Sequence, residues 1–341
     1  MRAVMWLGPR QMQMEELPPI QPAANEALIV VEAVGICGSE LSGYLGQSSI
    51  RVPPLIMGHE FAGRVVQLGA QAQGLAIGDL VAVNPLVTCG VCQACTSGHD
   101  NLCPQRALIG AHRPGAFAEY VAAPALNCHP ISPALGPVVA ALTEPLACGV
   151  RATRLGNVGP GTRVMVVGAG TIGLMCIAAV RHAGGRVVLV SDIHPDRLAT
   201  AQRWGAENIC DTRRTDPAAL AYSLCDGHGA DVVIEAVGLD ITRRSAVASV
   251  RLGGTIVLLG LHEAESPLAI NHIVRSEIQL IGSFSYTIAD FAQALDMITR
   301  GVLKPDASWL EERPLEACQF SFDQLIDTPP AIAKIMLRPT L

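Results

Sequence analysis

Charged side chains are scarce in this sequence of 341 residues, at 16% against about 25% in an average soluble domain. The formal net charge is −6, and no block of basic residues occurs. Nucleic acid and anionic membrane surfaces are therefore not expected as partners. The low charge content favours a compact, heavily buried enzyme or oligomer.

Long apolar segments are also missing. The first residues, MRAVMWLGPRQMQ, lack the continuous apolar run of a signal peptide, so we expect a cytoplasmic protein. Residues 164–180 are 17 uncharged residues, near the lower limit of about 17 to 25 for a membrane span. Their glycine pattern and the strand that follows argue against a span. In a reducing compartment, the 11 cysteines are expected to be thiols and metal ligands rather than disulfides.

Two hydrophobic patterns divide the chain. Residues 1–152 contain short β-branched runs between glycine and proline turns, which predicts a partly open β-barrel. In residues 153–284, strands near 164, 187, 232, 255 and 278 alternate with helical segments such as 195–204, which predicts a doubly wound parallel sheet. The expected fold class is α/β.

The tail, residues 285–341, is predicted to return to the first domain, which makes the nucleotide domain an insertion. We expect a helix over 288–300, then short strands and a last helix near 331–336.

A glycine pattern dominates the second region. The apolar run Val164–Val167 is typical of a buried strand, and Gly168, Gly170 and Gly173 follow at GxGxxG spacing. The first glycine allows a tight turn, the second lets backbone amides approach a pyrophosphate, and the third lets the next helix pack closely. This predicts a dinucleotide site at a helix N-terminus. A flavodoxin-like unit without nucleotide is the alternative.

Asp192 ends the next β-branched run, 19 residues beyond Gly173. A carboxylate there accepts hydrogen bonds from the adenosine ribose and repels a 2′-phosphate, so the expected cofactor is NAD rather than NADP. His194 and Arg197 lie just downstream and can soften this preference.

Four cysteines at C-x2-C-x2-C-x7-C spacing lie in a polar loop: Cys89, Cys92, Cys95 and Cys103. Four thiolates this close can converge tetrahedrally on one zinc ion. Two disulfides and an iron–sulfur cluster are the competing interpretations. Because four thiolates leave no coordination position open, the predicted zinc is structural.

A second set of candidate ligands is dispersed along the first region. Cys37, His59, Glu60 and Glu144 supply a thiolate, an imidazole and two carboxylates. A set of this kind can hold zinc with one position open for water or an alcohol oxygen.

Arg113 is a solvated loop charge or a contact to an anionic substrate.

Five motifs in order carry a family resemblance: GHE after PP, the cysteine loop, GAFAEY at 115–120, EPLAC at 144–148 and VVGAGTIG. Over essentially its whole length the sequence resembles the zinc-containing medium-chain alcohol dehydrogenases, and within them the polyol branch. The resemblance implies a GroES-like barrel joined to a Rossmann domain, with one catalytic zinc, one structural zinc and NAD. It also implies a homodimer or homotetramer built through the edge strand at 278–283.

The resemblance also implies roles for single residues. Cys37, His59 and Glu60 match the catalytic zinc ligands, although Glu144 is the alternative third ligand, and Ser39 starts the proton relay. The implied cofactor contacts are Gly168, Gly170, Thr171, Ile172, Gly173, Asp192, Arg197, Gly260, Leu261, Ser283, Phe284 and Ser285.

Several positions depart from the family pattern. In CGSD-x-H, Glu40 stands for the aspartate behind the zinc-bound histidine and Ser42 for the relay histidine, so the proton passes through Ser42 and water or through the cofactor ribose. Gly43 occupies the position of a family tyrosine that touches polyols. Ser285 occupies the position of a family arginine. These changes argue against sorbitol itself as the substrate.

The predicted function is zinc-dependent hydride transfer to NAD⁺ from a secondary alcohol, namely a polyol, a sugar alcohol or its phosphate. An L-threonine or vicinal-diol dehydrogenase is the alternative within the same class. From a different class comes a non-catalytic nucleotide-binding protein. Such a protein has no use for the open zinc site that the dispersed ligands predict.

Overall fold

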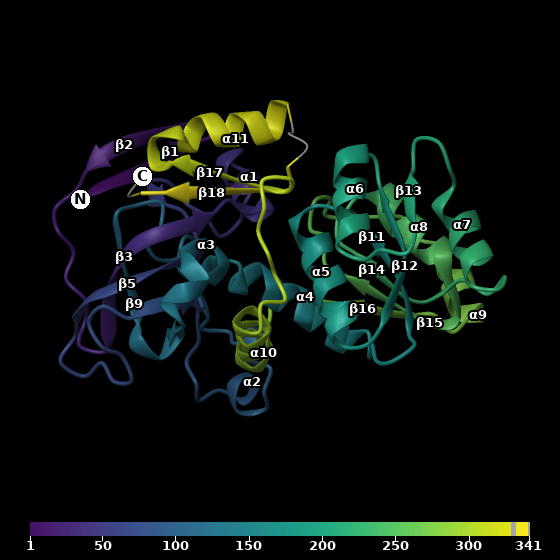
Figure 1. The fold of residues 1–341 in the computed structure, drawn as a ribbon, viewed down its shortest axis with the longest axis horizontal. Helices are drawn as coiled ribbons and strands as arrows, with labels where there is room; N and C mark the ends of the chain where they lie inside the picture. The colour runs from purple at the N-terminus through teal and green to yellow at the C-terminus, as the bar shows by residue number, and fades with distance from the viewer. Residues whose placement is uncertain (329–331, 340–341) are drawn as a thin grey trace. The chain divides into compact units, whose positions relative to one another are not determined.

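The computed structural model describes residues 1–328 and 332–339. The chain forms two compact units, labelled along the ribbon of Figure 1: Met1–Glu144 with Thr287–Leu341, and Pro145–Tyr286. The second unit is thus an insertion in the first. Its boundaries fall at 144/145 and 286/287, beside the 152/153 and 284/285 expected from the sequence pattern.

The first unit is built around a seven-stranded sheet of order β10-β6-β5-β3-β18-β17, in which β9 also pairs with β3. Two small sheets, β2-β1-β4 and β7-β8, accompany it. The strands are β1 Arg2–Gly8, β2 Gln11–Glu16, β3 Glu26–Gly35, β4 Leu55–Ile56, β5 Glu60–Leu68, β6 Leu80–Val83, β7 Leu86–Val87, β8 Ala107–Leu108, β9 Tyr120–Pro124, β10 Cys128–Pro130, β17 Leu310–Pro314 and β18 Lys334–Arg338.

Short helices connect these strands, and the few aromatic side chains gather in the core between them. The rings of Phe117 and Phe322 meet edge to face at 5.8 Å, and Tyr44 packs on Phe322 at 5.1 Å. The helices are α1 Gly38–Tyr44, α2 Gln93–Thr96, α3 Gly136–Ala141, α10 Ile288–Thr299 and α11 Cys318–Asp327, with 3-10 turns η1 Asp100–Leu102, η2 Ala125–Asn127, η3 Pro133–Leu135 and η4 Leu315–Ala317.

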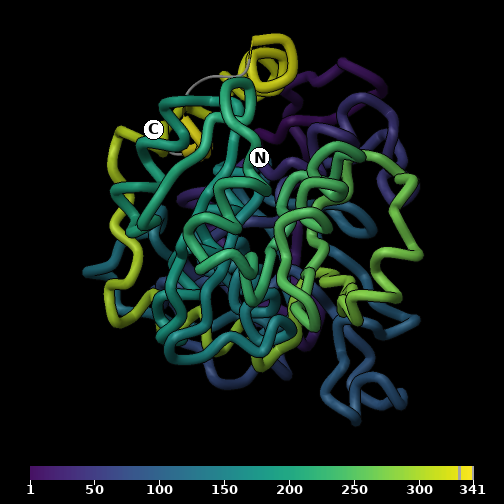
Figure 2. Tube along the Cα trace, turned by 90° about the vertical axis from the view of Figure 1, so that its right-hand side faces the viewer, coloured from purple at the N-terminus to yellow at the C-terminus, as the bar shows by residue number. Residues whose placement is uncertain are grey.

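The helix predicted near 331–336 is wrong over its described part, since Lys334–Arg338 forms strand β18. This strand lies between β3 and β17 and is buried on both faces, so its side chains lack the alternation that marks a strand in a sequence. Residue 331 lies outside the described residues. Figures 1 and 2 show the yellow C-terminal segment returning to the purple N-terminal strands.

The second unit holds one parallel sheet of order β13-β12-β11-β14-β15-β16. Counted along the chain this is 3-2-1-4-5-6, the arrangement of dinucleotide-binding folds. It confirms the α/β class, and the short strand β13 is an addition to the predicted five. The elements are α4 Thr143–Leu155, β11 Arg163–Val167, α5 Thr171–His182, β12 Arg186–Asp192, α6 Pro195–Arg203, β13 Ile209–Asp211, α7 Pro217–Leu224, β14 Ala230–Glu235, α8 Asp240–Ser249, β15 Val250–Leu258, α9 Ile270–Arg275 and β16 Gln279–Gly282.

Within the described ranges, no single helix has the length and apolar character needed to cross a membrane. One bent pair, Pro133–Ala141 with Thr143–Leu155, meets the length and composition criteria together.

Candidate active site and cofactor site

Three of the dispersed candidate ligands lie together in the first unit. Cys37 follows β3 and is the N-cap of α1, while His59 directly precedes β5 and Glu60 begins it. The two strands pair antiparallel with Gly35 opposite Glu60, so the end of one meets the start of the other. One ligand atom from each of the three side chains lies within 4.8 Å of the others. This donor set and spacing fit a zinc ion, whose bonds to such ligands are about 2.0–2.3 Å long.

Glu40 orients this set through its two carboxylate oxygens. Its Oε1 accepts from the Gly58 amide and from His59 Nδ1, both at 2.8 Å, and its Oε2 accepts from the Cys37 amide at 3.1 Å. With Nδ1 engaged, Nε2 is the imidazole nitrogen left for a metal. The longer side chain of Glu40 therefore still reaches the histidine.

Glu40 and His59 shift each other's pKa in this cluster. Burial raises the pKa of the Glu40 carboxyl, but the His59 ring and the Arg51 guanidinium outweigh burial and lower that pKa. Burial in turn lowers the pKa of His59, yet the Glu40 carboxylate and the Cys37 sulfur raise it well above its usual value. The Glu40 carboxylate therefore stays ionised beside the His59 ring.

A buried lysine holds the Glu60 carboxylate. Lys334, in β18, is 2% exposed; its Nζ donates to the Ile36 carbonyl at 2.9 Å and pairs with Glu60 Oε2. Burial lowers the pKa of Lys334, but Glu60 and Cys37 outweigh burial and raise it. Sequence reasoning missed this residue because 274 positions separate it from Glu60.

Ser39 and Arg51 border Cys37. The exposed Ser39 donates from Oγ to the Cys37 sulfur at 3.5 Å. Arg51 donates from Nη1 to the Ser39 carbonyl at 3.2 Å and from Nη2 to the Ser39 hydroxyl at 3.3 Å. Sequence reasoning also missed Arg51, since none of the five motifs contains it.

Two other predicted candidates lie outside this group. Glu144 is buried in the first turn of α4, but it does not belong to the cluster of potential ligand atoms in the described part of the chain. Arg113 pairs with Glu26. Burial raises the pKa of Glu26, but the hydrogen bond and charge of Arg113 together with the hydrogen bond from the Ala23 amide outweigh burial and lower that pKa. The Arg113 charge is thus already compensated within the protein.

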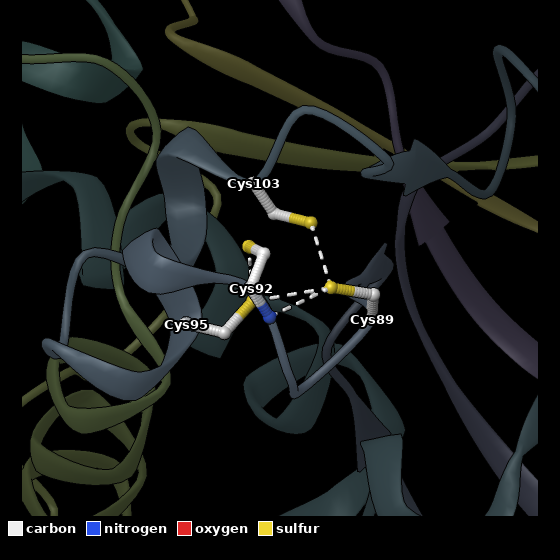
Figure 3. Close-up of side chains that lie close together, drawn as sticks. All are labelled: Cys89, Cys92, Cys95 and Cys103. Atoms are coloured by element: carbon white, nitrogen blue, oxygen red, sulfur yellow. Dashed lines mark hydrogen bonds between the residues drawn. The ribbon is translucent and has the colours of Figure 1, made fainter.

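The four cysteines of the predicted lobe converge around α2, as Figure 3 shows. The Sγ–Sγ distances are 3.9 Å from Cys89 to Cys95, 3.5 Å from Cys92 to Cys95 and 3.6 Å from Cys103 to Cys89. The edge of a tetrahedron with zinc–sulfur bonds of about 2.3 Å is about 3.8 Å. Backbone amides of residues 91 and 92 lower the pKa of Cys89 to about 6, which favours its thiolate. All four are free thiols, which argues against two disulfides.

The second unit contains a cavity of about 920 Å³ at the carboxyl ends of its strands. Gly168, Gly170, Asp192 and Arg197 line it. A Cβ on Gly173 would lie 1.9 Å from the Gly168 carbonyl oxygen, so only glycine lets α5 pack this closely. Thr171 and Ile172 form the first turn of α5, whose N-terminus begins beside the cavity.

Asp192 ends β12 with both carboxylate oxygens engaged. Its Oδ2 accepts from the Ala169 amide at 2.7 Å, and its Oδ1 accepts from the His194 amide at 2.9 Å. These bonds hold the carboxylate at the cavity while its remaining lone pairs can accept from ribose hydroxyls.

The other predicted cofactor residues lie on two loops that follow the carboxyl ends of strands in the same sheet. Gly260 and Leu261 follow β15, and Ser283, Phe284 and Ser285 follow β16. The Ser283 amide donates to the Leu258 carbonyl at 2.8 Å, which ties the second loop to β15. None of these five residues lines the cavity.

Comparisons with known proteins agree with this architecture. Residues 23–133 match the model of the alcohol dehydrogenase GroES-like domain, and residues 171–300 match that of the zinc-binding dehydrogenases. Sorbitol dehydrogenase of Bacillus subtilis is 32% identical, covering 99% of this chain and 97% of that protein. L-galactonate-5-dehydrogenase of Escherichia coli is 34% identical over 89% and 88% of the two chains. The crystal structure of galactitol-1-phosphate dehydrogenase from Escherichia coli superposes with a TM-score of 0.92, at 25% identity over 99% and 100%.

The chain belongs to the zinc-containing medium-chain alcohol dehydrogenase family. Within it, the chain falls in the polyol branch and is an NAD-dependent zinc enzyme, which confirms the resemblance drawn from the five motifs.

Proposed function

We propose that this enzyme oxidises a secondary alcohol group of a polyol, a sugar alcohol or its phosphate, with NAD⁺ as hydride acceptor. The observation that carries the proposal is the convergence of Cys37, His59 and Glu60 with the Ser39 hydroxyl on the Cys37 sulfur. The names of the relatives support the substrate class, because they act on a hexitol, a sugar acid and a hexitol phosphate.

In this proposal Cys37, His59 and Glu60 hold the catalytic zinc. When bound, zinc acts as a Lewis acid that lowers the pKa of an alcohol oxygen. Glu60 is favoured over Glu144 as third ligand, because only Glu60 lies within ligand distance of the other two side chains among the described residues. Cys89, Cys92, Cys95 and Cys103 hold the structural zinc.

The protein's own groups then hold and move the proton. Glu40 fixes the His59 ring, and Lys334 holds one oxygen of Glu60. The Ser39 Oγ accepts the proton of the substrate alcohol, and Ser42 with water, or the cofactor ribose, carries it onward. The Rossmann glycines and Asp192 place NAD, with the residues of the two loops after β15 and β16 around the nicotinamide.

An L-threonine or vicinal-diol substrate is the second candidate, and oligomeric assembly and a cytoplasmic location stay predictions. β16 is the edge strand of its sheet, and Gln279 and Leu280 on it are exposed, which supports a homodimer or homotetramer built through that edge.

The first experiment follows the absorbance of reduced nicotinamide with NAD⁺ and hexitols, pentitols, polyol phosphates, 2,3-butanediol and L-threonine, with and without a zinc chelator. We expect a chelator-sensitive signal on polyols or their phosphates. A signal on L-threonine or the diol alone would replace the first candidate by the second.

A variant then tests the site itself. Cys37→Ser is expected to abolish turnover while NAD⁺ binding, followed by intrinsic fluorescence, stays close to that of the wild type. Turnover that survives in this variant would refute the proposed ligand set.

A further inference from the structure

Arg51 is a buried cation without an anionic partner in the described part of the chain. This residue is 4% exposed, and within the described ranges its hydrogen bonds go only to the carbonyl and hydroxyl of Ser39. The Nε atom is buried and has no hydrogen-bond partner among the residues that the structure describes. A guanidinium has five N–H donors, so most of this fork is unsatisfied. Charged side chains are rarely buried unless they are paired, because removing a charge from water is unfavourable.

The neighbouring carboxylates are already committed to other groups. The charge of Arg51 helps to lower the pKa of Glu40. The Glu40 oxygens, however, accept hydrogen bonds from the Cys37 amide, the Gly58 amide and His59. Glu60 pairs with Lys334. Arg51 therefore has no counter-ion in this part of the protein.

The side chain of Arg51 packs against Gly43 of α1. A Cβ on Gly43 would lie 2.6 Å from Arg51 Cδ, so the absence of a side chain at position 43 leaves the space that the arginine stem occupies. The guanidinium thereby lies against Ser39, which itself contacts Cys37. An unpaired cation is thus held two hydrogen bonds from the proposed zinc ligand.

We infer that Arg51 is a specificity-determining residue that binds a carboxylate or phosphate group of the substrate. The planar guanidinium fork matches both groups in bidentate geometry. The substrate class is then an anionic polyol, a sugar acid or a polyol phosphate, rather than a neutral hexitol. This inference rests on the proposed function, because it concerns the substrate of that same site.

The test compares matched substrates: hexonates and hexitol phosphates against the neutral hexitols of the same configuration. In the wild type, we expect kcat/KM for the best anionic compound to exceed that of its neutral parent at least about tenfold, as charge-assisted bidentate contacts commonly give. In Arg51→Met the anionic-to-neutral ratio is expected to fall about 10- to 100-fold, mainly through KM. Arg51→Lys should lie between the two. Comparing hexonates with hexitol phosphates shows whether Arg51 binds a carboxylate or a phosphate.

Arg113→Met is the matched control, since Arg113 is also an arginine of the first unit but is partly exposed and paired with Glu26. Its anionic-to-neutral ratio should equal that of the wild type. Equal losses on anionic and neutral substrates in Arg51→Met would mean that Arg51 only supports Ser39, and a wild type that prefers neutral hexitols would overturn the inference directly.

The proposed function can fail separately. If no compound is oxidised, the thermal shift produced by hexitol phosphates and hexonates in the wild type and in Arg51→Met is measured. If the stabilisation is present in the wild type and absent in Arg51→Met, Arg51 binds the anion but the proposed reaction is wrong. If the wild type itself shows no stabilisation, both the anion site and the proposed reaction are refuted.

Discussion

At the residue scale, Glu40 stands where the family pattern has an aspartate, and it still reaches the His59 ring. Its carboxylate bonds His59 Nδ1 and the amides on either side of the site, so it holds both a proposed ligand and its backbone. Replacing Glu40 by Gln keeps the size but loses the negative charge on His59. We expect zinc affinity or kcat/KM to fall about 10- to 100-fold, the usual effect of removing a carboxylate behind a zinc-bound histidine.

Metal content by mass spectrometry and kcat/KM measure this effect, and Glu40→Asp, which restores the family residue, is the control. Full zinc retention and full activity in Glu40→Gln would show that the backbone bonds alone position the site.

At the same scale, we expect Asp192 to set the choice between NAD⁺ and NADP⁺. Its carboxylate is anchored by the amides of Ala169 and His194 at the cavity edge, where a 2′-phosphate would meet its charge. Asp192→Ala is expected to lower the NAD⁺-to-NADP⁺ ratio of kcat/KM by about tenfold or more. Initial rates with both cofactors measure the ratio, and an unchanged value would remove Asp192 from the ribose contact.

At the scale of elements, Asp231 ties three neighbouring strands of the second sheet together. It is the second residue of β14, accepts from the amide of Arg163 at 2.8 Å and pairs with the Arg163 and Arg251 side chains of β11 and β15. Burial raises its pKa, but the bonds from Arg163 and Arg251 outweigh burial and lower it. Asp231→Asn is therefore expected to be less stable at pH 7 by about 1–2 kcal/mol, since the pair is partly solvated.

The pH dependence follows from the direction of that shift. A lowered pKa in the folded state gives stability that is present above the unfolded value of about 3.9 and is lost as the pH falls through the folded value. Urea midpoints from pH 7 to pH 3 should fall more steeply for the wild type than for Asp231→Asn, and the two curves should approach each other at the acidic end. Parallel curves would contradict the assignment.

At the scale of the whole molecule, the two ligand groups predict two zinc ions per chain with separate consequences. The wild type should contain two equivalents, and Cys37→Ser and Cys103→Ser one each. Loss of the structural zinc should lower the melting temperature even with substrate and NAD⁺ present, because the cysteine lobe has few apolar contacts of its own. Loss of the catalytic zinc should remove activity with a smaller change in melting temperature. One equivalent in the wild type would contradict the two-site assignment.

Particular elements show how far sequence reasoning reached. The strand-turn-helix over 164–182 and the cysteine lobe were predictable because their contacts are local: the glycine close approach spans five positions and the sulfurs come from one loop. The helix predicted near 331–336 failed because β18 is buried between two strands, so its apolar pattern does not reveal which element it forms. β13 was missed because it is only three residues long.

The sequence by itself determined the fold class, the dinucleotide motif, the family and the candidate ligands, since each depends on short-range spacing. Only the tertiary structure decided what surrounds those ligands. It brought Lys334 to Glu60 across 274 positions and paired Arg113 with Glu26. Among the residues that the structure describes, it also kept Glu144 out of the ligand group and left Arg51 without a counter-ion beside Ser39. Burial and long-range pairing depend on how distant strands meet, and no local pattern records that meeting.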